Sequence, residues 1–225
     1  MSRNRIADLQ LRGNTSPLPV RVYWPAQAAS QPAPVLVFCV VGTGAEAWPG
    51  GLGVPGAEAP CRGLSENPGL TVLSVACDPA DPRAGTQVLE WAAEHAAELG
   101  GDPGRLLVGG QDAGGAAAAE VALGARAHGW PPIARQVLIS ASPVARRSVA
   151  GVAPATVVTI RHHRGGDGGR YAARLRRAGV DVDELLYPGL RPAPGRVHAD
   201  LGEALRRSLS GPAMNIGGRC RPPSE

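Results

Sequence analysis

Residues Val108–Gly115 read VGGQDAGG and join an apolar run, Arg105–Val108 (RLLV), to an alanine-rich run, Ala116–Leu123 (AAAAEVAL). The apolar run has the composition of a buried strand, and the alanine-rich run has that of a helix. The glycines between them allow a strand and a helix to approach closely at a sharp turn. The stretch therefore predicts a strand, a tight turn and a helix, with Asp112 at the apex of the turn.

The composition of the chain is that of one globular domain. It has 225 residues, of which 44% are hydrophobic and 4% aromatic, so small aliphatic side chains must build the core. The 31 glycines and 22 prolines mostly separate periodic segments, as loops do. The net charge is +4, every basic residue is arginine, and the one arginine cluster, Arg174–Arg177, lies on a predicted helix. We therefore expect no surface for nucleic acid.

The cysteines and the chain ends predict a soluble protein without a metal. Cys39, Cys61, Cys77 and Cys220 lack the paired spacing of a zinc or redox motif, and no cofactor is expected. The first residues lack the apolar region of a signal peptide, and no apolar run approaches about 18 residues. We expect a cytoplasmic location without membrane contact, a single domain over residues 1–210, and a mobile tail over residues 211–225.

Strand and helix patterns alternate along most of the chain. Nearly continuous apolar strands separated by helices indicate an α/β fold with a mostly parallel sheet covered on both faces. We predict strands at Leu18–Trp24, Pro34–Val41, Leu70–Ala76, Arg105–Gly109, Gln136–Ser140, Ala155–Ile160 and Val182–Tyr187, the first as an antiparallel edge strand. We predict helices at Ala57–Glu66, Gly85–Leu99, Ala113–His128, Gly169–Ala178 and Ala199–Leu209.

The order of these elements and several local runs resemble the α/β-hydrolase fold, and specifically the hormone-sensitive-lipase-like esterases. The strongest part of the resemblance is Trp91–Gly115, where the family usually has a helix, a Gly-Asp-Pro turn, a strand and Gly-Asp-Ser-Ala-Gly-Gly. Pro132–Ile139 and Tyr187–Gly189 are also similar to family runs. The resemblance implies the α/β-hydrolase fold over Leu18–Leu209, with a reduced or absent cap because the chain is short.

The positions that the resemblance assigns to the catalytic triad carry other residues. Asp112 stands at the nucleophile position, the acid position falls near His163, and the histidine position falls near Pro192. The family's oxyanion loop falls on Val40–Thr43, which keeps one glycine. Ordinary serine-esterase activity is therefore not expected. We expect a ligand to contact Val41, Gly42, Thr43, Gln111 and Ala113.

An aspartate at this turn has two possible chemical roles. It would project above the carboxyl edge of the sheet at a helix N-terminus, where backbone amides favour negative charge. It can attack carbon as a nucleophile, as the aspartate of haloalkane dehalogenases and epoxide hydrolases does, or it can accept a proton as a general base. The amides of Thr43 and Ala113 are candidates for stabilising developing charge in either case.

A nucleophilic aspartate needs a histidine to activate water, and two histidines are candidates. His198 can reach Asp112 if the loop Leu190–Val197 folds back, and His163 can supply a second polar group above the pocket. The alternative is that both are solvated, with His198 near the start of the last helix.

Three functions remain open at this stage. The first is general-base catalysis by Asp112 without hydrolysis, such as elimination, cyclisation, rearrangement or epimerisation. Secondary metabolism is a setting in which such a reaction would fit. The second is a pseudoenzyme that binds a ligand or partner, with Asp112 as an acceptor or helix cap. The third is hydrolysis of an epoxide, ester or lactone by an aspartate nucleophile. The partner is a small molecule in the catalytic cases, and a homodimer through Val182–Tyr187 and Ala199–Leu209 is a possible assembly.

Overall fold

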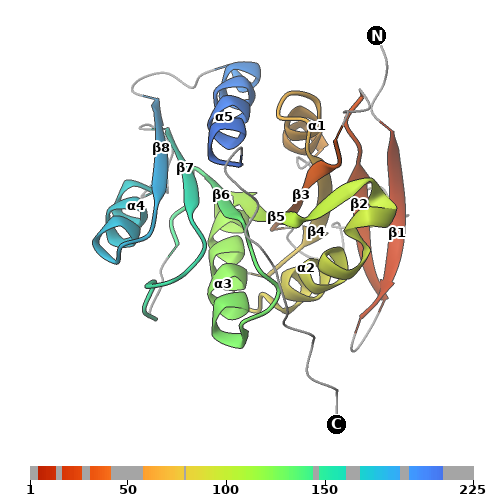
Figure 1. The fold of residues 1–225 in the computed structure, drawn as a ribbon, viewed down its shortest axis with the longest axis horizontal. Coiled ribbons are helices and arrows are strands. Elements are labelled where there is room, and N and C mark those ends of the chain that lie inside the picture. The colour runs from red at the N-terminus through yellow and green to blue at the C-terminus, as the bar shows by residue number, and fades with distance from the viewer. Residues whose placement is uncertain are drawn as a thin grey trace.

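The structure of the protein is a computed structural model, drawn in Figure 1. It describes residues 5–13, 17–26, 31–41, 58–78, 80–143, 147–160, 168–187 and 193–209. These residues form an eight-stranded sheet with the strand order β1-β2-β4-β3-β5-β6-β7-β8. The strands are β1 (Ile6–Arg12), β2 (Pro17–Tyr23), β3 (Ala33–Val40), β4 (Thr71–Ala76), β5 (Gly101–Gln111), β6 (Arg135–Ile139), β7 (Ala155–Ile160) and β8 (Val182–Tyr187).

The sheet is parallel except at one side. β1 pairs antiparallel with β2, and β2 pairs antiparallel with β4, whereas every other neighbouring pair is parallel. The parallel strands β6 and β7 are buried at every position, as expected for strands that helices cover on both faces. The carboxyl ends of β3 to β8 consequently lie along one edge of the sheet, which we call the carboxyl edge.

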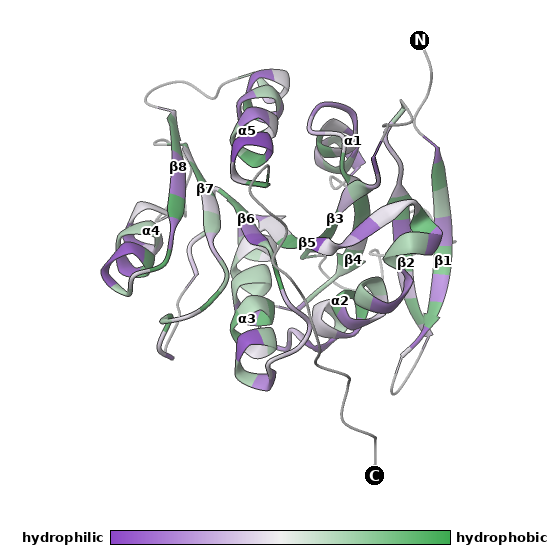
Figure 2. Cartoon of the chain, viewed as in Figure 1, coloured by the Kyte–Doolittle hydropathy of each residue, from purple (hydrophilic) through white to green (hydrophobic). Residues whose placement is uncertain are grey.

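Helices cover the two faces of the sheet, as Figure 1 shows. One face packs against α2 (Arg83–His95), α3 (Ala113–His128) and α4 (Gly168–Arg177), and the other against α1 (Glu58–Glu66) and α5 (Pro194–Leu209). A short 3₁₀ helix, Ala96–Leu99, extends α2. In Figure 2 the first turns of α3 are pale green, whereas α4 and α5 carry purple and green side by side. α3 is thus a buried small-residue helix, and α4 and α5 are amphipathic.

The α/β fold with helices on both faces is confirmed, and several predicted elements are placed correctly. The helix Ala113–His128 and the strands Ala155–Ile160 and Val182–Tyr187 have the predicted bounds. Those three segments have strong local patterns, and the sequence places a glycine directly after the helix and a proline directly after the last strand.

One N-terminal strand was missed, and the edge position predicted for another was wrong. The strand β1 was not predicted, and it takes the edge position that had been assigned to β2. β1 is amphipathic, with burial that alternates between intermediate and exposed residues along Asp8–Arg12, so its sequence, IADLQLR, lacks the long apolar run of a buried strand. Arg21 of β2 donates to both carboxylate oxygens of Asp8 in β1, at 2.7 and 2.8 Å.

The last helix begins five residues before its predicted start. α5 begins at Pro194, whereas the prediction placed its first residue at Ala199. Proline fits the first turn of a helix because the amide hydrogen it lacks would have no partner within the helix. Pro194 can therefore begin α5, followed by Gly195 in the same turn. The shift places His198 within α5 rather than in the connection before it.

Candidate functional site

Asp112 lies at the apex of the predicted turn, between the end of β5 and the start of α3. Its backbone has φ 52° and ψ −120°, a conformation that side-chain-bearing residues seldom adopt. Its amide donates to the carbonyl of Ile139 in β6 at 2.9 Å, which ties the apex to the neighbouring strand. A positive φ at this position persists only when the surrounding packing enforces it.

Three glycines provide that packing. A Cβ atom added at Gly110 would lie 2.4 Å from the backbone of Gly114, and one at Gly114 would lie 2.2 Å from the carbonyl oxygen of Cys39. A Cβ atom at Gly115 would lie 2.4 Å from Cβ of Ala141. These contacts join β5, β3 and the end of β6 to the first turn of α3. The close approach expected from the glycines is confirmed, and the side chain of Ala113 beside them is exposed.

The Asp112 carboxylate is partly buried and is not a helix cap. The residue holds the N-cap position of α3, yet its side chain makes no capping hydrogen bond. Oδ2 instead accepts a hydrogen bond from Nε2 of Gln111 at 3.2 Å. The alternative that Asp112 caps the helix with its side chain is therefore wrong, and the side chain of Gln111 orients the carboxylate instead.

A second residue with positive φ follows the neighbouring strand. Ser140, directly after β6, has φ 48°, is buried, and donates its amide to the carbonyl of Val158 in β7 at 2.8 Å. The turn at Ser140 brings Ala141 against Gly115 and thereby supports the start of α3. No pattern in the sequence marks Ser140, because serine has no preference for this conformation.

His198 lies in α5 and packs against α1. A Cβ atom added at Gly63 of α1 would lie 2.1 Å from both Cε1 and Nδ1 of the imidazole. Burial lowers the pKa of His198, and the charge of Glu66 opposes that shift. The imidazole therefore occupies the α1–α5 interface, where Gly63 makes room for it, and not a solvated position at the start of a helix.

Other predicted site residues lie partly outside the described part of the chain. Val41 follows β3 at the carboxyl edge and is partly buried. Gly42, Thr43 and His163 lie outside the described residues, as does the tail over residues 211–225. The predictions for these residues remain predictions.

One polar pair at the carboxyl edge was not predicted. The hydroxyl of Tyr187, the last residue of β8, donates to Oδ2 of Asp200 in α5 at 2.6 Å. Burial and this hydrogen bond raise the pKa of Tyr187. The pair fixes the first turns of α5 against the end of β8. The resemblance had marked Tyr187 only as part of a sequence motif.

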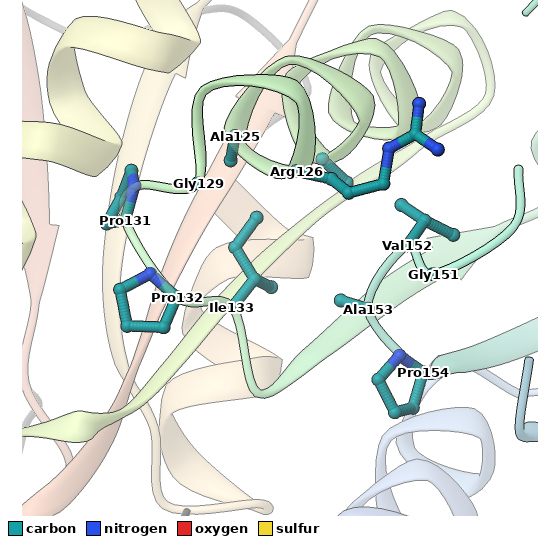
Figure 3. A pocket seen from close by; sticks show the side chains of 11 residues that line it. Ala125, Arg126, Gly129, Pro131, Pro132, Ile133, Gly151, Val152, Ala153 and Pro154 are labelled. Carbon is teal, nitrogen blue, oxygen red and sulfur yellow. The ribbon is translucent and has the colours of Figure 1, made fainter. Parts of the chain in front are cut away.

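A pocket lies at the opposite edge of the sheet, and Figure 3 shows its walls. It has a volume of about 290 Å³ and lies between the end of α3 and the segments that precede β6 and β7. Its walls include Ala125, Ile133, Val152 and Pro154. Since α3 runs from Asp112 toward this edge, the pocket is separated from Asp112 by the length of that helix.

The described residues hold no cluster of three or more histidine, cysteine, aspartate or glutamate side chains able to bind a metal ion. Within the same described part of the chain, no helix has both the length and the apolar character needed to span a membrane.

Comparisons with known proteins identify the fold. Residues 54–145 match the sequence pattern of a family with the α/β-hydrolase fold. The chain is 32% identical over 214 residues to the esterase LipI of Mycobacterium tuberculosis, covering 89% of this chain and 62% of that protein. It is 36% identical over 127 residues to the carboxylesterase NlhH of the same species, covering 54% of this chain and 38% of that protein. The chain thus spans less than two thirds of each of these relatives.

Solved structures agree with the fold. The esterase LipW of Mycobacterium marinum is similar with a TM-score of 0.73 at 24% identity, covering 92% of this chain and 82% of that one. An esterase from Pyrobaculum calidifontis is similar with a TM-score of 0.74 at 22% identity, covering 92% and 86%. The sheet order, the close-packed turn at Asp112 and these similarities lead to one conclusion: the chain has the α/β-hydrolase fold, and its residues 54–145 carry the sequence pattern of that family.

Proposed function

We propose that the protein hydrolyses a small ester, lactone or epoxide with Asp112 as the nucleophile. The observation that carries the proposal is the backbone of Asp112, which keeps a strained conformation at the apex of the turn while its carboxylate stays out of helix capping. Strain of this kind costs about 1–3 kcal/mol and is typical of functional positions. The relatives named as esterases favour hydrolysis over other reactions.

The reaction has two steps in which the carboxylate is consumed and restored. A carboxylate oxygen of Asp112 attacks the electrophilic carbon, the bond from that carbon to its leaving oxygen breaks, and the leaving oxygen takes a proton from solvent water. A second water, whose proton passes to the predicted histidine, His198 or His163, then adds to the carboxyl carbon of Asp112. The bond from that carbon to the substrate oxygen breaks, the product leaves with one proton of this water, and the carboxylate returns with one oxygen from water while the histidine gives its proton back to solvent. Gln111 holds the attacking group in place through its hydrogen bond to Oδ2.

The first turn of α3 provides the electrostatic environment. Asp112 precedes the helix directly, and the free amides at a helix N-terminus stabilise negative charge that develops on an oxygen. The amide of Ala113 is the donor that this chain can place beside the reacting carbon. Residues after β3, among them Thr43, would supply a second donor.

A second candidate is general-base catalysis by Asp112 without hydrolysis, through elimination, cyclisation, rearrangement or epimerisation. The strained backbone of Asp112 supports this candidate as it supports the first, and proton abstraction by a carboxylate needs no histidine. In this case the carboxylate is never esterified.

The substitution Asp112→Asn tests both candidates. We expect kcat/KM to fall about 10²- to 10⁴-fold on any substrate that the wild type turns over, because the amide neither attacks carbon nor accepts the proton. The probes are short-chain p-nitrophenyl esters, lactones and epoxides. Asp78→Asn is the matched control, since Asp78 is an exposed aspartate after β4 whose Oδ1 accepts from the amide of Ala80, as an asparagine oxygen can. An Asp112→Asn protein with wild-type turnover would exclude both candidates.

Turnover in water enriched in oxygen-18 separates the two candidates. The nucleophilic route places the isotope in the Asp112 side chain, whereas the general-base route leaves that side chain unlabelled. A ligand that binds and is recovered unchanged after long incubation would contradict both and would identify a pseudoenzyme.

A further inference from the structure

Two cysteine thiols lie together at the carboxyl ends of neighbouring strands. Cys39 belongs to β3 and is fully buried, and Cys77 directly follows β4 with 5% of its surface exposed. The Sγ atoms of both lie 3.1 Å from the position that a Cβ atom on Gly85 of α2 would take. Both thiols are free, and the neighbouring Cys77 thiol, followed by burial, raises the pKa of Cys39.

We propose that Cys39 and Cys77 form a modification site, at which a hydroperoxide converts the two thiols into a reversible disulfide. The proposal does not depend on the function assigned to Asp112.

The backbone keeps the two residues in a fixed relation. β3 and β4 are paired in parallel with Cys39 opposite Val75, and the amide of Cys77 donates to the carbonyl of Val40 at 2.8 Å. Gly85 leaves the space that both sulfur atoms occupy, because any side chain there would collide with them. The two sulfur atoms thus lie beside the same point at Gly85, and a bond of about 2.05 Å requires them to approach each other there.

The chemistry starts at the more exposed thiol. The sulfur of Cys77 takes an oxygen atom from the hydroperoxide to give a sulfenic acid, and an alcohol or water leaves. The sulfur of Cys39 then attacks the sulfur of Cys77, the S–S bond forms, and the hydroxyl leaves as water with the proton from Cys39. One hydroperoxide is reduced and two thiols are oxidised. Its interaction with Cys77, in which the Cys39 thiol is the donor, and burial both raise the pKa of Cys39, so this thiol stays protonated while Cys77 is oxidised first.

The pair lies against the turn that carries Asp112. The carbonyl oxygen of Cys39 is 2.2 Å from the position of a Cβ atom on Gly114, so β3 packs directly on the first turn of α3. A disulfide would therefore change the end of β3 that leads to Val41 and the loop after it.

The test is a peptide map of the full chain carrying Cys220→Ser, before and after treatment with hydrogen peroxide. Cleavage after arginine and glutamate places Cys39, Cys61 and Cys77 in separate peptides. We expect a linked peptide pair that contains Cys39 and Cys77, lighter by two hydrogens, which dithiothreitol separates again. Cys61 is the internal control, because it is equally buried but hydrogen-bonds to Ser74 instead of a second thiol.

The substitution Cys39→Ala isolates the first step. Without its partner, Cys77 should keep the sulfenic acid, and labelling of Cys77 by dimedone should rise several-fold over the parent protein. Absence of the linked pair in the parent protein, or oxidation of Cys61 as fast as that of Cys77, would overturn the proposal. The peptide map of the parent protein decides the question even if Cys39→Ala does not fold.

Discussion

At the scale of single residues, Gly114 and Gly124 allow the same substitution to be compared on one helix. Both lie in α3, but a Cβ atom at Gly114 would collide with the backbone of β3, whereas one at Gly124 would meet no atom within 4 Å. The packing at the first turn of the helix is therefore much tighter than near its end. The tight packing at Gly114 helps to hold the neighbouring Asp112 in its strained backbone conformation, and the comparison of the two glycines tests that packing.

We expect Gly114→Ala to lower the free energy of unfolding by about 1–3 kcal/mol, because the strand and helix must separate to fit the methyl group. Gly124→Ala should raise it by about 0.5–1 kcal/mol, because alanine is the better helix former. Urea unfolding followed by circular dichroism measures both. Similar effects of the two substitutions would contradict the close approach at Asp112.

At the scale of elements, His198 couples the packing of α1 and α5 to pH. Burial lowers its pKa in the folded protein, so the folded state prefers the neutral imidazole. A lowered pKa contributes stability that is fully present above the unfolded pKa, which is 6.5, and that is lost as the pH falls toward the folded pKa.

The free energy of unfolding should therefore decrease as the pH is lowered from 7 through 6, and His198→Gln should reduce that dependence. The measurement is urea unfolding at several pH values. His128→Gln is the control, because His128 is exposed at the end of α3, with its Nδ1 2.8 Å from the carbonyl of Gly124. A pH dependence that His198→Gln leaves unchanged would show that other groups cause it.

At the scale of the whole molecule, Arg135 connects the three neighbouring strands β6, β7 and β8. Its side chain is 5% exposed, and it donates to Asp181 at 2.6 Å, to Asp183 at 3.1 Å and to the carbonyl of Ala155 at 3.0 Å. These contacts link the start of β6 to the starts of β7 and β8. One buried guanidinium thus holds the amino ends of three strands together.

We expect Arg135→Ala to lower the free energy of unfolding by about 2 kcal/mol, since it removes several charge-assisted hydrogen bonds while the two aspartates remain partly hydrated. Arg207→Ala is the control, because Arg207 forms an exposed ion pair with Glu203 within α5, worth at most about 0.5 kcal/mol. Thermal or urea unfolding of both variants measures the difference. Equal losses would show that Arg135 does not connect the strands.

The sequence predicted the turn at Asp112 well because its signals are local. The glycines around Asp112 and the alanine-rich run after it predict a close strand-to-helix passage without reference to the rest of the chain. The bounds of α3, β7 and β8 were also predicted correctly. Apolar periodicity and helix-ending glycines operate within one segment, so they can be read without knowing the neighbours.

The surroundings of the site required the tertiary structure. α5 begins at Pro194, and it places the imidazole of His198 against Gly63, which lies more than a hundred residues earlier in the chain. Ser140 was missed because its conformation is imposed by neighbouring strands and not preferred by serine.

The sequence by itself determined the alternation of strands and helices, the α/β fold and the presence of a carboxylate at the apex of the turn. The tertiary structure alone decided that β1 occupies the edge of the sheet, that His198 packs between two helices, and that the sulfur atoms of Cys39 and Cys77 both lie beside Gly85. The reason is physical: periodicity and turn chemistry depend on residues a few positions apart, whereas contacts between distant segments depend on how the sheet and helices close around one core.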